Sequence, residues 1–197
     1  NGNFKETRMK YIKKARSPFA HLKWCYVQRR LGVNYNYGSL PTAIKNMVKD
    51  RLLEEQGFIC GYTMKRIYNS TSHIEHLYPQ TLCAIGQDLR YHNFIACFPK
   101  PISGGKICPF GAEQRGSWWD AVLFISPLNE SCELKFVFNL KGEIAGSGNN
   151  ISASKETIKR LKLCEASLTN ERKLAIEAFI WGNGGLSISD IDLAIDS

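Results

Sequence analysis

The sequence predicts an α+β fold, and three features support it. With 197 residues, 44% of them hydrophobic, the chain is long enough to bury a sizeable core. Apolar residues recur at helical spacing between residues 39 and 57 and again after residue 154. Between these regions lie short apolar runs bounded by turn residues, which are typical of strands. Helices are therefore expected to flank a central region of short strands.

The first predicted helix runs from Ser39 to Gly57. Ser39 can cap its N-terminus, Pro41 suits its first turn and Gly57 can end it. Its apolar positions have helical spacing, and they are Ile44, Val48, Leu52 and Leu53. Two more helices are predicted over residues 157–163 and 169–181.

The predicted strands occupy the middle of the chain. Residues 58–79 are expected to form a short hairpin whose last strand, His73–Tyr78, is stopped by Pro79. An apolar segment follows at residues 93–97. Residues 124–127 and 134–140 have the composition of strands.

The net charge of +8 lies entirely in the N-terminal segment. Residues 1–30 hold nine basic side chains and one acid, whereas the remainder holds 17 of each. This predicts a basic arm over residues 1–40, a core over 41–150 and a helical segment over 151–197. The arm is either a solvated segment or a phosphate-contacting one. In the second case the contacts would come from Lys10, Lys13, Lys14 and Arg16.

The composition also bears on location. No run of about eighteen apolar residues is present, and the basic N-terminus lacks the apolar stretch and cleavage site of a secretory signal. A soluble, cytoplasmic protein is expected. Seven irregularly spaced cysteines are then expected to be reduced, and most of them to be small buried hydrophobes.

The candidate catalytic residues lie in a cluster of histidines that begins at His73. In a strand, His73 and Glu75 point to one face and His76 to the other. A carboxylate beside a neutral imidazole suits phosphodiester hydrolysis, because a metal ion can stabilise charge on the phosphate while the imidazole deprotonates water. As single residues, these histidines would more often be structural.

Three ordered segments resemble the HNH (ββα-metal) endonuclease pattern: Leu53–Cys60, His73–Pro79 and Asp88–Cys97. The chain more closely resembles the PtuB-like branch found in Septu and some retron anti-phage systems, through Cys108–Gly116 and Phe124–Glu133. The resemblance covers roughly residues 50–175. It implies a ββα-metal (HNH) core flanked by helices.

The resemblance also implies roles for individual residues. Glu75 matches the first motif position and is expected to bind Mg²⁺ or Mn²⁺, His76 matches the general base, and Asn93 matches the Asn that orients the base-bearing strand. The third motif residue has no clear match. Glu113 is the candidate, and His73 is a second candidate ligand because it shares a strand face with Glu75.

Many HNH proteins also hold a structural zinc ion between two cysteine pairs. Here Cys60 has Thr63 three residues later in place of a second cysteine, and Cys97 and Cys108 are the remaining candidates. Three thiolates do not complete a tetrahedral site. Structural zinc is therefore doubtful, and a standard four-cysteine site is not expected.

The function expected from the resemblance is metal-dependent endonucleolytic cleavage of DNA or RNA, tRNA included, in an anti-phage complex. The implied partners are a PtuA-like ATPase and, in a retron, a reverse transcriptase with its DNA. Four basic residues flank the motifs as further candidate phosphate contacts: Lys65, Arg66, Arg90 and Arg115. The alternative is a catalytically inactive HNH-like module that binds nucleic acid or acts as a scaffold.

Overall fold

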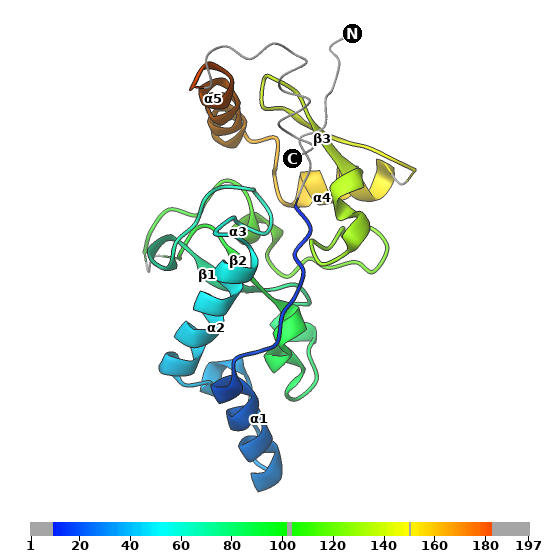
Figure 1. Cartoon of the computed structure of the whole chain (residues 1–197). Helices are drawn as coiled ribbons and strands as arrows, with labels where there is room; N and C mark the ends of the chain where they lie inside the picture. Colours follow the sequence, from blue (N-terminus) through cyan, green and yellow to red (C-terminus); the bar gives the residue numbers. More distant parts are fainter. Residues whose placement is uncertain (1–9, 102–103, 150, 183–197) are drawn as a thin grey trace.

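The computed structural model of the chain describes residues 10–101, 104–149 and 151–182, arranged as helices and two small antiparallel sheets (Figure 1). The fold is therefore α+β, as predicted. The first nine residues of the predicted arm and residues 183–197 lie outside the described part. Within that part, no helix is long and apolar enough to span a membrane.

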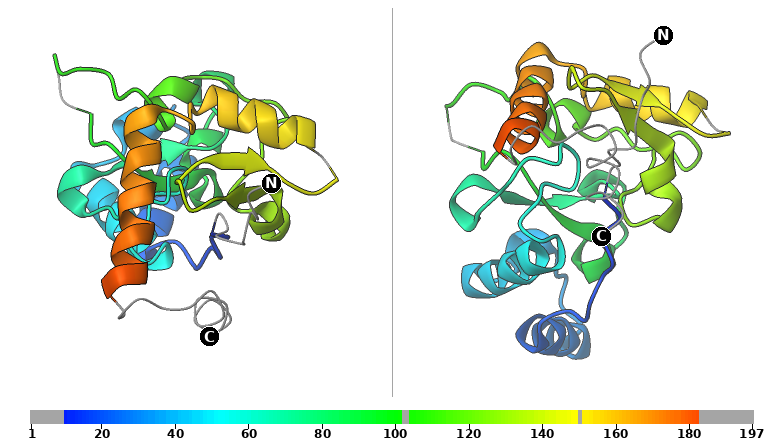
Figure 2. Two further views of the ribbon diagram at one scale, coloured as in Figure 1. Left: turned by 90° about the horizontal axis from the view of Figure 1, so that it is seen from above. Right: turned by 45° about the horizontal axis from the view of Figure 1, so that its top comes forward.

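Two helices form one end of the molecule. α1 (Phe19–Leu31) and α2 (Thr42–Glu55) lie side by side in the right-hand view of Figure 2 and contact each other. α2 begins later than predicted, directly after Pro41. Ser39 does not cap it, because its hydroxyl belongs instead to a reciprocal capping arrangement with Asn36 around a short 3₁₀ turn.

The strand at the histidine cluster pairs differently from the prediction. β1 (His73–His76) is antiparallel to β2 (Phe94–Cys97), with His73 opposite Cys97 and His76 opposite Phe94. The expected hairpin within residues 58–79 is reduced to one bridge between Ile59 and Arg66. All four residues of β2 are buried, so this strand lies within the core.

A buried glutamine joins α2 to this sheet. Gln56, at the end of α2, donates to the carbonyls of Ile59 and Ala96 and accepts from the Ala96 N–H, at 2.7–2.9 Å. A buried amide that makes three such bonds holds the helix end and the strand in one register. α3 (Ala112–Arg115) is a single turn that follows the loop after β2.

The second sheet lies towards the other end of the molecule, near the C-terminal helices (Figure 1). β3 (Phe136–Phe138) pairs with β4 (Ile144–Gly146), and α4 (Ile151–Arg160) packs against β4. α5 (Ala166–Gly182) begins before the predicted Thr169. Residues 124–127 are not a strand. The 3₁₀ turns are Tyr37–Ser39, Asn69–Thr71, Gln80–Leu82, Gln87–Leu89, Tyr91–Asn93 and Glu130–Lys135.

Residues 10–15 form an extended segment, here called the N-terminal strap, that runs from α1 along the molecule (Figure 1). Ile12 is in the core and its N–H donates to the Pro127 carbonyl at 2.9 Å. Lys14 forms a buried ion pair with Glu55 at 2.9 Å and donates to the Phe94 carbonyl. This part of the predicted arm is therefore packed rather than solvated.

Candidate active site

The β1–β2 pair positions the residues of the motif. Because alternate residues of a strand face opposite sides, Glu75 and His73 share one face of β1 and His76 takes the other. His76 is only 6% exposed, while Glu75 and His73 are partly exposed. The predicted division into two faces is therefore present.

The His76 ring is held in one orientation by its neighbours. Its Nε2 lies 3.0 Å from the Asp88 carbonyl oxygen, and the edges of Tyr37 and Phe94 contact it at centroid distances of 4.7 and 4.9 Å. A carbonyl only accepts, so Nε2 carries the proton and Nδ1 of the neutral ring has the lone pair. Tyr37 is held in turn by its N–H, which donates to the Asp88 carboxylate at 2.6 Å.

This environment suits a base near neutral pH. Burial lowers the pKa of His76 below its ordinary value of 6.5, although the Asp88 carbonyl and the charge of Glu75 oppose the shift. Nδ1 makes no hydrogen bond to a described residue and is not among the fully buried unpartnered atoms. Within the described part of the chain, no donor therefore occupies the lone pair of His76.

Asn93 ties the loop before β2 to the chain just after β1. Its Oδ1 accepts from the Tyr78 N–H at 2.6 Å, and its Nδ2 donates to the Tyr78 carbonyl at 3.0 Å. The side chain thus pairs with both backbone groups of a residue two positions beyond His76. These two bonds fix the chain just beyond β1; the orienting role of Asn93 stays a prediction.

Glu75 is paired with Arg115 of α3. Its Oε1 accepts from Nη2 and Nε of Arg115, at 2.6 and 3.1 Å. The Arg115 side chain is only 2% exposed and also donates to the carbonyls of His76, Leu77 and Trp118. Arg115 therefore fastens α3 to the end of β1, and it is not the phosphate contact that the sequence suggested, because it is buried.

His73 lies against the second oxygen of Glu75. Its Nδ1 donates to the Pro99 carbonyl at 2.5 Å, which leaves Nε2 3.5 Å from Glu75 Oε2. Burial opposes the charged ring, but the hydrogen bond and charge of Glu75 outweigh it, so the pKa of His73 is raised.

Nε2 of His73 and Oε2 of Glu75 are placed to supply two of the ligands of a divalent cation. Two ligands that each bind one ion at about 2.1 Å lie about 3–4 Å apart, and a metal-binding histidine commonly donates its other N–H to a carbonyl. His73 Nε2 and Glu75 Oε2 meet both conditions. Water and substrate would supply the remaining ligands, because Mg²⁺ keeps several waters in protein sites.

The third expected ligand lies elsewhere. Glu113 accepts a hydrogen bond from the Cys108 N–H. Across residues 10–101, 104–149 and 151–182, no three His, Cys, Asp or Glu side chains gather to hold a metal ion. Any cation here would depend on His73 and Glu75.

Two of the candidate zinc cysteines lie together. Cys97 and Thr63 lie beside the Cys60 sulfur, and the Phe98 N–H donates to that sulfur at 3.3 Å. Burial disfavours a thiolate, but polar contacts from Cys97, Thr63 and the Phe98 N–H outweigh it and lower the pKa of Cys60, while burial raises the pKa of Cys97. Thr63 thus lies near this sulfur at the position where a zinc site would have its second cysteine.

The basic residues predicted to contact nucleic acid divide into those that form ion pairs within the chain and those that are exposed. Lys14 is buried and paired with Glu55, so its predicted nucleic-acid contact is wrong. Lys65 pairs with Glu171 at 2.6 Å and lies over the Phe98 ring. The exposed ones, which remain candidates, are Lys10, Lys13, Arg16, Arg66 and Arg90.

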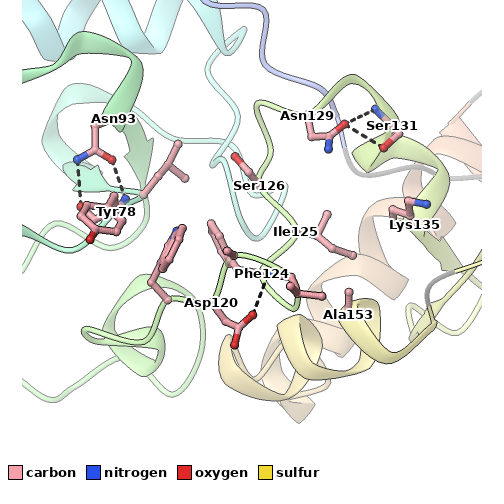
Figure 3. A pocket seen from close by; sticks show the side chains of 14 residues that line it. Tyr78, Asn93, Asp120, Phe124, Ile125, Ser126, Asn129, Ser131, Lys135 and Ala153 are labelled. Atoms are coloured by element: carbon pink, nitrogen blue, oxygen red, sulfur yellow. Dashed lines mark hydrogen bonds between the residues drawn. The ribbon is translucent and has the colours of Figure 1, made fainter. Parts of the chain in front are cut away.

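A pocket of about 400 Å³ adjoins the motif (Figure 3). Leu77, Tyr78 and Asn93 form part of its wall, and residues 119–135 form most of the rest. The sequence reasoning missed this pocket, and it also missed Tyr37 and Asp88, which hold His76. No local pattern marks such residues, because they come together only in the folded chain.

No model of a protein family matches the chain. The chain is similar to a protein of Vibrio cholerae serotype O1 biovar El Tor named "Retron Vc95 putative HNH endonuclease". The two are 29% identical over 145 residues, which cover 70% of this chain and 67% of that protein. This similarity supports the resemblance to HNH endonucleases that the motifs carry.

Proposed function

We propose that the chain is an HNH-type endonuclease that hydrolyses phosphodiester bonds, with His76 as general base. The observation that carries this proposal is the tautomer in which the His76 ring is held. Its proton is fixed on Nε2 by the Asp88 carbonyl, and its lone pair is on Nδ1. The Asn93–Tyr78 bonds and the retron protein of Vibrio cholerae support it.

In the proposed reaction His76 Nδ1 accepts a proton from water as the water oxygen attacks phosphorus. The bond from phosphorus to the leaving oxygen breaks, and that oxygen takes up a proton from solvent. Asn93 keeps the strand end in place through Tyr78. A divalent cation held by His73 and Glu75 would, when bound, stabilise the negative charge on the phosphate.

Metal dependence is the first test. The full chain, reconstituted with its partner ATPase, is expected to cleave DNA or tRNA in Mg²⁺ or Mn²⁺ and to lose all cleavage in EDTA. Glu75→Gln removes the anionic ligand and is expected to raise the Mg²⁺ concentration needed for half-maximal rate. Cleavage that persists in EDTA would exclude this mechanism.

We further propose that the nuclease works with a PtuA-like ATPase and, in a retron, with a reverse transcriptase and its DNA. An exposed apolar stripe on α1 supports a protein partner. It comprises Phe19, Leu22 and Tyr26, and Phe19 is 78% exposed. Exposed Lys23, Arg29 and Arg30 flank it, so a second copy of this chain would bring like charges together and a partner with acidic residues would fit.

Polar substitution on this stripe tests the partner. The double variant Leu22→Glu, Tyr26→Glu is expected to reduce co-purification with the ATPase at least tenfold, because central apolar anchors dominate binding. The exposed Leu140 lies outside the stripe, so Leu140→Glu is the matched control. Equal recovery of the ATPase with all three proteins would contradict the assignment.

One observation favours a second candidate, an inactive HNH-like module that binds nucleic acid or acts as a scaffold. Arg115 already neutralises one oxygen of Glu75. If that ion pair excludes a cation, the chain would bind nucleic acid and the partner without cleaving. Nucleic-acid binding with no cleavage under any metal would establish it.

A further inference from the structure

The pocket beside the motif has two chemically different sides (Figure 3). Tyr78 and Asn93 lie on one side, while Asn129, Ser131 and Lys135 lie on the opposite one. Its volume of about 400 Å³ is within the range of small-molecule sites, roughly 300–1,000 Å³. The Leu77–Tyr78 wall continues directly from His76.

Aromatic surface is available on the motif side. Tyr78 and Trp119 meet edge to face at a centroid distance of 4.9 Å, and Trp119 stays 37% exposed in spite of that contact. Phe124 adds a third ring to the lining. Nucleobases stack on such rings, and the stacking is worth about 1–3 kcal/mol per base.

A cation lies on the other side. Lys135 has no carboxylate within ion-pair distance in the described part of the chain, and it is half-buried rather than fully solvated. The Ser131 hydroxyl beside it hydrogen-bonds to Asn129 Oδ1 at 2.9 Å, which leaves the Asn129 amide N–H groups available. Ammonium and amide donors together suit a phosphate.

Asp120 places a negative charge on one side of the pocket, which determines how a charged ligand would be oriented. Its Oδ1 accepts from the N–H groups of Val122 and Leu123, both at 2.8 Å, so the carboxylate is fixed in the lining. A phosphate would be repelled from this carboxylate and attracted to Lys135. A ligand with one flat ring and one phosphate would therefore place the phosphate near Lys135 and the ring near Trp119.

We propose that this pocket binds one nucleotide of the nucleic-acid strand, with its base against Trp119 and Tyr78 and its phosphate at Lys135. The proposal rests on the proposed nuclease function and adds a subsite to it. A nucleotide held here lies next to the strand end that carries His76, so the pocket would fix the strand relative to the base.

The test is the binding of adenosine 5′-monophosphate to the full chain, measured by calorimetry; this ligand has no phosphodiester bond, so the proposed reaction does not consume it. Trp119→Ala and Lys135→Ala are each expected to weaken binding at least fivefold, and Trp119→Phe to retain most of it. Lys106→Ala is the matched control, because Lys106 is exposed and does not line the pocket. Inorganic phosphate should bind more weakly, and its binding should depend on Lys135 but not on Trp119.

Absence of nucleotide binding, or unchanged affinity in both pocket variants, would overturn the subsite. Cleavage by the protein with native His76 would then still stand, because it is measured independently. Specific nucleotide binding in a protein that never cleaves would instead support the subsite and refute the nuclease. The two proposals therefore fail in different experiments.

Discussion

Replacement of His76 by alanine is expected to lower the rate of phosphodiester cleavage about 10²–10⁴-fold, the usual cost of losing a general base. His76 Nδ1 carries the lone pair that would accept the proton from water. Because His76 is buried, His76→Gln is a useful second variant, since its amide reaches the place of Nε2 and can still donate to the Asp88 carbonyl. His92 is exposed, and His92→Ala is expected to cleave normally.

The pH profile gives an independent readout of the same residue. Burial lowers the pKa of His76 below 6.5, and the base acts when deprotonated. The rate kcat/KM should therefore be independent of pH around neutrality and fall only as pH drops below that value. Cleavage by folded His76→Ala at the native rate, or an acid limb centred above neutrality, would remove His76 from the mechanism.

Replacement of Arg115 is expected to be the most destabilising single change at the site. Arg115→Met leaves the Glu75 carboxylate and the carbonyls of His76, Leu77 and Trp118 without their donor. Loss of one partner of a buried ion pair typically costs about 3–5 kcal/mol. The free energy of unfolding, measured by urea titration, should fall by about that amount.

Two matched variants separate the contribution of the Glu75–Arg115 ion pair from the general effect of replacing an arginine. Arg90 is an exposed arginine, and Arg90→Met should change the free energy of unfolding by less than about 0.5 kcal/mol. The double variant Glu75→Gln, Arg115→Met should recover part of the loss, because it no longer contains an unpaired carboxylate. If Arg115→Met were as stable as Arg90→Met, the fastening of α3 to β1 would be unimportant.

The sequence predicted local features of the fold better than strand pairing. The helical spacing of Val48, Leu52 and Leu53 correctly placed α2, and those residues are buried. The strand at His73–His76 was also correct, but its partner was not, because β2 lies about twenty residues away and a pattern of period two does not specify a partner.

The same limit applies to the site. Side-chain alternation in a strand correctly separated Glu75 from His76. Burial could not be read from residue type, since Lys14 and Arg115 look like other basic residues in the sequence and yet their side chains are only 4% and 2% exposed. Trp119 and Lys135 carry no motif, and only the pocket brings them near Tyr78.

The N-terminal strap has a consequence for how the chain folds. The Tyr11 N–H donates to the Glu133 carboxylate at 2.8 Å, across 122 positions of sequence, and the Ala15 N–H donates to Glu55. Contacts of such high sequence separation slow folding, because a long loop must close before they form. During synthesis, residues 10–15 emerge before residues 127–133. They cannot pack in their final position until those later residues have been made. Until then the core cluster that contains Val48 and Leu52 lacks Ile12, and part of its apolar surface stays exposed on the growing chain.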